Sequence, residues 1–168
     1  THCISSAASD VYKRQPELEK EGIYVDTLDE IYAQADVITL HVPALKDNYH
    51  MLNDDAFSKM KDGVYILNYA RGSLIDTDAL IRSLDNGKVA GAGLDTYENE
   101  VGIFDVDHKG EKITDDVFNN LFARDNVLIT PHAAFYTTKA VKNMVQISLN
   151  NNKSFIENGK ADNEVSFD

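Results

Sequence analysis

Arginine, carboxylate and histidine side chains follow three stretches of the sequence that read as buried β-strands. Arg71 follows the apolar run 63–67, Asp95 ends the run 89–95, and His132 ends the run 126–132. Ligands of open α/β sheets bind where the carboxyl ends of the strands meet, so we expect these side chains at one such edge. Their joint placement is the strongest indication of a functional site in this sequence.

Each of these side chains has a defined chemistry and an ordinary alternative. The Arg71 guanidinium, next to Gly72, can bind a carboxylate through two parallel hydrogen bonds, or it is a surface arginine in a loop. His132 can act as a general acid or base because imidazole titrates near neutral pH, or its ring hydrogen-bonds to backbone in a turn. A carboxylate on the other ring nitrogen would fix the tautomer of the ring, and the pattern does not choose between Glu98 and Glu100.

The strands that position these residues alternate with helices along the chain. Thr27, Asn53 and Asp76 are expected to cap helices. The near-continuous apolar run 36–43 predicts a strand that is covered on both faces. The alternation is typical of an α/β fold with a parallel sheet. The predicted helices are 16–22, 28–35, 54–60, 76–84, 114–123 and 136–157, and the predicted strands are 23–26, 36–43, 63–67, 89–95 and 126–132.

The composition excludes several classes of function. The net charge of −12 argues against binding to nucleic acid or to an anionic membrane surface. No apolar run reaches the ~18–20 residues of a membrane span. Cys3 is the single cysteine, the five histidines lack metal-ligand spacing, and Gly91-Ala92-Gly93 lacks the third glycine of a dinucleotide fingerprint. We therefore expect a cytoplasmic protein with no nucleic-acid, membrane or metal partner.

From Pro16 onwards the sequence resembles the D-isomer-specific 2-hydroxyacid dehydrogenases, and within them the bacterial lactate-type branch. The resemblance rests on four ordered segments, 35–43, 68–78, 93–104 and 126–138. It implies an NAD-dependent oxidoreductase that acts on the CH–OH group of a D-2-hydroxy acid. The reaction would be reversible hydride transfer between NADH and pyruvate or a similar small 2-oxo acid. The implied fold is an incomplete Rossmann-like, doubly wound parallel sheet.

The same resemblance implies roles for individual residues. Arg71 matches the arginine that binds the carboxylate and carbonyl of the substrate, and His132 matches the acid/base. Glu100, five residues after Asp95, matches the glutamate that pairs with this histidine, and Asp95 matches a residue beside the nicotinamide. The positions that match contacts to NAD are Val42, Pro43, Asn48, Tyr69, Ala70, Arg71 and Asp95.

The resemblance also predicts how the chain is divided. Residues 1–15 are a stub outside the family, 16–135 are a partial NAD-binding domain, and 136–168 are a C-terminal helix and tail. In the family this helix packs on a substrate domain, which the sequence lacks. We therefore expect a fragment that exposes apolar surface on the 136–157 helix and is inactive and marginally stable by itself. The dimer contacts of the family lie mostly around the cofactor domain, so the resemblance allows a homodimer.

Two other interpretations of the sequence stay open. Relatives with this fold serve as NAD-sensing corepressors, and they keep the residues that match Arg71, Glu100 and His132. The lactate-type segments 102–104 and 134–138 argue against this binding module. The third interpretation is a structural α/β domain without a catalytic role.

Overall fold

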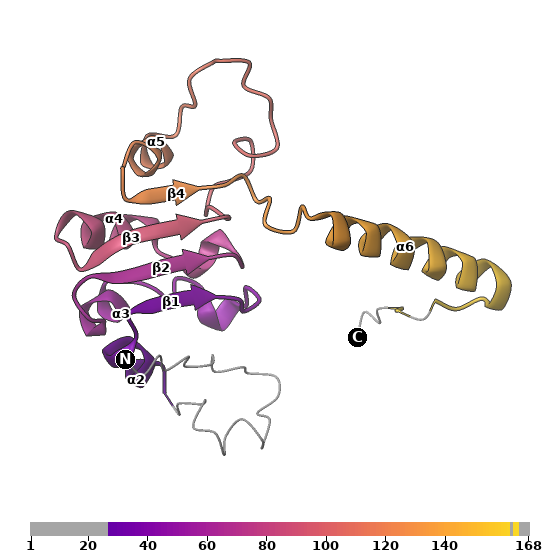
Figure 1. Cartoon of the computed structure of the whole chain (residues 1–168), viewed down its shortest axis with the longest axis horizontal. Coiled ribbons are helices and arrows are strands. Elements are labelled where there is room, and N and C mark those ends of the chain that lie inside the picture. Colours follow the sequence, from indigo (N-terminus) through magenta and orange to yellow (C-terminus); the bar gives the residue numbers. More distant parts are fainter. Residues whose placement is uncertain (1–26, 162, 165–168) are drawn as a thin grey trace. The chain divides into compact units, whose positions relative to one another are not determined.

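The computed structural model describes residues 27–161 and 163–164. The chain forms two compact units, which are Thr1–His132 and Ala133–Asp168. The predicted stub 1–15, helix 16–22 and strand 23–26 lie outside the described residues. The first unit holds β1 (Val37–Leu40), β2 (Val64–Asn68), β3 (Val89–Leu94) and β4 (Val127–Ile129), with α2 (Leu28–Gln34), α3 (Asp54–Lys59), α4 (Thr77–Asp85) and α5 (Asp116–Phe122) (Figure 1).

The four strands form one parallel sheet in the order β1-β2-β3-β4, which confirms the predicted α/β class. In the register, Leu40 pairs with Asn68, Asn68 with Leu94, and Leu94 with Ile129. The last residues of all four strands therefore lie side by side. The segments that follow the four strands therefore all start from the same edge of the sheet (Figure 1), as parallel strands require.

Local capping fixes where the helices begin. The three predicted N-caps are confirmed, because each side chain accepts a hydrogen bond from the backbone N–H three residues on. The distances are 3.3, 3.1 and 3.0 Å for Thr27, Asn53 and Asp76. Two short 3₁₀ helices, η1 (Lys46–Asn48) and η2 (Gly72–Leu74), lie in segments that the sequence predicts as loops.

The hydrophobic core lies on one face of the sheet. Ile38, Ile66 and Val89 are buried there with Phe57 of α3 and Leu80 of α4. On the opposite face, Val37, Tyr65 and Leu128 are each more than half exposed. The prediction that the 36–43 strand is covered on both faces is therefore wrong for the described part of the chain. A continuous apolar run is equally compatible with a strand that has one open face, so the pattern could not decide.

Two glycines in β3 shape this open face. A Cβ atom at Gly91 would meet the ring of Tyr65 at 3.2–3.3 Å, and one at Gly93 would meet Leu67 Cδ2 at 2.9 Å. The large side chains of β2 thus lie over the bare backbone of β3.

The second unit contains α6 (Thr138–Asn158), which ends at Gly159 with a left-handed φ of 69°. No residue of α6 is buried, and apolar side chains such as Val145, Leu149 and Ile156 are exposed. This agrees with the exposed apolar helix surface that the sequence predicts. Within the described residues, no helix is long and apolar enough to cross a membrane.

Gly72 joins the segment after β2 to the loop after β3. A Cβ atom at Gly72 would lie only 2.1–2.3 Å from the backbone of Tyr97 and Glu98. No side chain fits there, since the atoms that it would meet are backbone and cannot rotate away. The loop after β3 therefore rests directly on η2.

We expect Gly72→Ala to lower the free energy of unfolding by about 3 kcal/mol, because the new methyl group must displace backbone. The matched control is Gly93→Ala, whose methyl group meets only the flexible end of Leu67 and should cost less than about 1 kcal/mol. Urea denaturation of both variants measures the difference. Equal losses for the two variants would contradict the close backbone contact.

Candidate active site

His132 and Glu100 form the best-defined pair at the carboxyl edge of the sheet. His132 Nδ1 lies 2.8 Å from Glu100 Oε1, and both side chains are partly exposed. An ionised carboxylate only accepts hydrogen bonds, so Nδ1 carries the proton and donates it. The Glu100 carboxylate thereby fixes the tautomer and orientation of the ring, which leaves Nε2 to exchange a proton with a bound molecule. Of the two acids that the sequence left open, the structure pairs Glu100 with the histidine.

The backbone of His132 is tied to the end of β3. His132 has a φ of 49°, which is uncommon for a residue other than glycine. Its backbone N–H donates to the carbonyl of Asp95 at 2.8 Å, and the hydroxyl of Thr130 donates to the Asp95 carboxylate at 2.5 Å. Asp95 is almost fully buried. These bonds hold the histidine in a conformation that an isolated turn would rarely adopt.

Tyr97 holds the other side of Glu100. The backbone N–H of Tyr97 donates to Glu100 Oε2 at 3.1 Å, so both carboxylate oxygens of Glu100 are hydrogen-bonded. The Tyr97 ring is buried and its hydroxyl donates to Asp115 at 2.9 Å. Burial, and then the bond to the Asp115 carboxylate, raises the pKa of Tyr97 from 10.0 to about 12. The turn that carries Glu100 is therefore anchored in the core.

Arg71 follows β2, the neighbour of β3 in the sheet. The buried Asn68 side chain shapes this turn: its amide donates to the carbonyl of Arg71 at 2.8 Å and accepts from the N–H of Ala70 at 3.0 Å. The guanidinium donates to the carbonyl of Ala70 at 2.7 Å. Within residues 27–161 Arg71 has no ion pair, so most of its donors can still bind a carboxylate from outside.

Of the predicted cofactor positions after β1 and β2, some are exposed to solvent and one, Asn48, stabilises its own loop. Val42 is partly exposed, and Pro43 and Tyr69 are exposed. Asn48 uses its amide within its own loop, because it donates to the carbonyl of Pro43 at 2.8 Å and accepts from the N–H of Leu45 at 2.7 Å. Asn48 therefore shapes the loop that carries Val42 and Pro43, and a bound molecule would meet those residues first.

The remaining predicted cofactor positions lie at the ends of β2 and β3. Ala70 and Asp95 are both buried. The exposed ring of Tyr69 lies 6.1 Å from the ring of His41 and almost parallel to it. Apolar and aromatic side chains on one part of the edge, with the Asp95 carboxylate next along it, suit a flat ring that carries polar groups. The residues present therefore fit a nicotinamide group.

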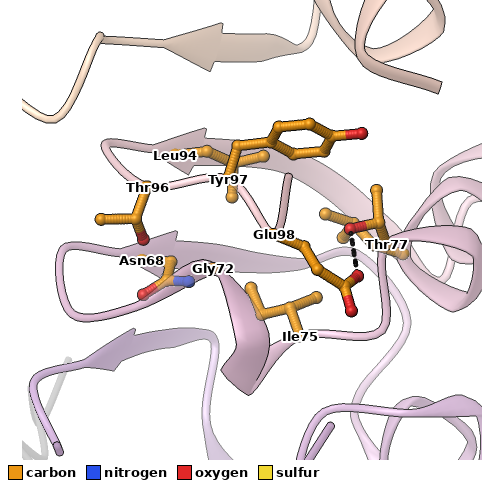
Figure 2. Close-up of a pocket in the computed structure, with 9 residues that line it drawn as sticks. Asn68, Gly72, Ile75, Thr77, Leu94, Thr96, Tyr97 and Glu98 are labelled. Carbon is orange, nitrogen blue, oxygen red and sulfur yellow. Dashed lines mark hydrogen bonds between the residues drawn. The ribbon is translucent and has the colours of Figure 1, made fainter. Parts of the chain in front are cut away.

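Sequence reasoning missed a second set of contacts beside this site. Glu98 lines a small pocket between the ends of β2 and β3 and accepts a hydrogen bond from Thr77 (Figure 2). It also binds His50 and Tyr49. His50 is 48 residues away from Glu98 in the sequence, and no local pattern connects residues at such a separation.

Comparison with known proteins assigns the family. Residues 4–134 match the family model described as D-isomer specific 2-hydroxyacid dehydrogenase, NAD binding domain. The chain belongs to this family. The D-lactate dehydrogenase of Lactiplantibacillus plantarum is 74% identical over 159 residues, which are 95% of this chain and 48% of that protein. The chain spans about half the length of the curated relatives that it matches.

Solved structures of the dehydrogenase family share the fold of the chain. A D-lactate dehydrogenase from Treponema pallidum superposes with a TM-score of 0.85 at 42% identity, over 94% of this chain and 47% of that one. The D-lactate dehydrogenase from Lactobacillus jensenii, solved with NAD⁺, gives a TM-score of 0.83 at 36% identity over the same shares. The sheet edge described above thus belongs to an NAD-binding domain of this family.

We expect Tyr97→Phe to lower the free energy of unfolding by about 1 kcal/mol at neutral pH, because the hydrogen bond to Asp115 is lost. Because folding raises the pKa of Tyr97 from 10.0 to about 12, its stabilising effect is complete below pH 10 and is lost as the pH rises through 12. The unfolding free energy of the unmodified chain should fall more steeply over this interval than that of the variant.

Chemical denaturation at a series of alkaline pH values measures the two slopes. Tyr136→Phe, at an exposed tyrosine, is the matched control and should keep the slope of the unmodified chain. If the unfolding free energies of Tyr97→Phe and of the unmodified chain fall in parallel as the pH rises, the raised pKa of the buried Tyr97 is contradicted.

Proposed function

We propose that this chain is the cofactor-binding half of an NAD-dependent D-2-hydroxyacid dehydrogenase, of the D-lactate type. The reaction is the reversible reduction of pyruvate, or a similar small 2-oxo acid, to the D-2-hydroxy acid. The observation that carries the proposal is the hydrogen bond between His132 and Glu100 at the same sheet edge as Arg71. The identity of 74% to a D-lactate dehydrogenase supports the lactate type.

Arg71 binds the carboxylate of the 2-oxo acid. Its guanidinium is exposed and lacks an ion pair within the described residues, and its planar fork matches the two oxygens of a carboxylate. The same charge lies close to the neighbouring carbonyl oxygen of such a substrate. As negative charge develops on that oxygen during reduction, the guanidinium stabilises it.

His132 supplies the proton of the reaction. In the direction of reduction, Nε2 of the protonated ring donates to the carbonyl oxygen while Nδ1 stays bound to Glu100. The negative Glu100 carboxylate stabilises the positive ring before the transfer and keeps its orientation afterwards. Proton transfer from a positioned imidazole contributes about 10²–10⁴-fold to the rate of such reactions.

NAD, when bound, supplies or accepts the hydride. Val42, Pro43, Tyr69, Ala70 and Asp95 would hold the nicotinamide end, and Asn48 would shape the loop that carries Val42 and Pro43. Apolar side chains exclude water from the ring, and the Asp95 carboxylate, fixed by Thr130, orients it. Arg71 belongs to this set as well as to the substrate site.

Three further properties belong to the same proposal. The domain boundary falls after residue 135, with the C-terminal helix and tail as a separate part. The protein acts in the cytoplasm as a homodimer, and its substrates are small 2-oxo and 2-hydroxy acids.

A chimeric enzyme tests the proposed activity. The matching segment of the Lactiplantibacillus plantarum D-lactate dehydrogenase is replaced by this chain, so that the remainder of that enzyme supplies the rest of the active site. We expect the chimera to oxidise NADH in the presence of pyruvate, and the 168-residue chain alone to show no turnover. A folded chimera that binds NADH and reduces no 2-oxo acid would contradict the proposal.

In the chimera, Arg71→Lys should lower kcat/KM for pyruvate about 10–100-fold, because an ammonium cannot form the paired hydrogen bonds of a guanidinium. The matched control is Arg82→Lys, at an exposed arginine of α4 that pairs with Asp54, and it should leave kcat/KM unchanged. Steady-state kinetics measure both variants. Equal kcat/KM values for the two variants would contradict the proposal that Arg71 binds the substrate.

A further inference from the structure

Glu98 is only two residues from Glu100, but its side chain binds a different set of partners. Glu98 Oε1 lies 2.5 Å from His50 Nε2 and accepts from the Tyr49 hydroxyl at 3.1 Å. Its other oxygen, Oε2, accepts from the Thr77 hydroxyl at 3.2 Å (Figure 2). Three side chains therefore hold one carboxylate, and the Glu98 side chain as a whole is 20% exposed.

His50 is itself held firmly. Its ring stacks on the ring of Tyr49 with centroids 3.9 Å apart, and its Nδ1 lies 3.9 Å from the Asp76 carboxylate. Its backbone N–H donates to the carbonyl of Ser73 in η2 at 2.9 Å. The hydrogen bond that the Tyr49 hydroxyl donates to the same Glu98 carboxylate raises the pKa of Tyr49.

These contacts attach the loop after β3 to two other segments, the one between β1 and α3 through Tyr49 and His50, and the start of α4 through Thr77. His50 and Thr77 lie on either side of η2 in the sequence, and η2 begins directly after Arg71. The backbone of Tyr97 and Glu98 lies against Gly72, with no room for a side chain between them. The Gly72 contact sets the distance between the loop after β3 and η2. The Glu98 hydrogen bonds set the orientation of that loop.

We propose that Glu98 is a positioning residue, held by His50 and Thr77, that orients the 96–100 loop so that Glu100 meets His132. Its importance for turnover rests on the proposed function, in which Glu100 serves His132. Tyr97 anchors this loop at one point. Without the Glu98 contacts, the residues after Tyr97 could turn about that anchor, which would separate the two atoms of the Glu100–His132 hydrogen bond. Glu98 acts through Glu100 and touches neither substrate nor cofactor.

Nuclear magnetic resonance of the 168-residue chain tests this role without any need for activity. The ¹⁵N shifts of the His132 ring at pH 8 report which nitrogen carries the proton. In the unmodified chain Nδ1 should be the protonated nitrogen. In Glu98→Gln, the Nε2-protonated fraction should rise at least about twofold, because Glu100 no longer selects the tautomer.

Two further variants separate positioning from charge. Glu111→Gln removes the same charge from an exposed side chain and should leave the His132 signals unchanged. His50→Leu keeps the Glu98 charge but removes the nitrogen that binds Glu98, and it should change the His132 tautomer in the same direction as Glu98→Gln. The double variant should show no larger effect than the larger single one, since the two residues act as a unit.

A folded Glu98→Gln chain with unchanged His132 signals would overturn the proposal. If that variant does not fold, His50→Leu decides by the same criterion. A chimera without dehydrogenase activity would refute the proposed function and leave this result standing, so the two failures are distinguishable.

Discussion

The hydrogen bond between His132 Nδ1 and Glu100 Oε1 joins two loops that leave neighbouring strands of the sheet. It forms because the backbone of His132 is bound to Asp95 at the end of β3, and because Tyr97 holds the second oxygen of Glu100. A ring held in this way has one tautomer and one orientation. The chemistry proposed for Nε2 depends on that constraint, since a freely rotating imidazole would seldom face a substrate.

The parallel sheet supplies the rest of the arrangement. Strand order places the turn of Arg71 beside the loop of Asp95, and the buried Asn68 side chain fixes the shape of that turn. Close contact at Gly72 then links the turn to the loop that carries Glu100. The site is built from segments far apart in the sequence, yet each is attached to the next by backbone or by buried side chains.

Features that depend on nearby residues could be predicted from the sequence. The N-caps at Thr27, Asn53 and Asp76 are local, and the four strands follow from apolar runs, although β1 and β4 each end three residues before the predicted positions 43 and 132. The open face of β1 could not be predicted, because an apolar run does not reveal what covers it. The choice between two acids two residues apart also required the structure. The contact between Glu98 and His50 spans 48 positions and has no signature in either segment.

A double-mutant cycle of Glu100 and His132 in the chimeric dehydrogenase tests most directly whether the two residues act as one unit. Glu100→Gln and His132→Gln should each lower kcat for pyruvate reduction, the second by about 10²–10⁴-fold. The double variant should be no slower than His132→Gln alone, because Glu100 acts only through the histidine. Losses that multiply in the double variant would show that Glu100 works independently, and would contradict the paired site.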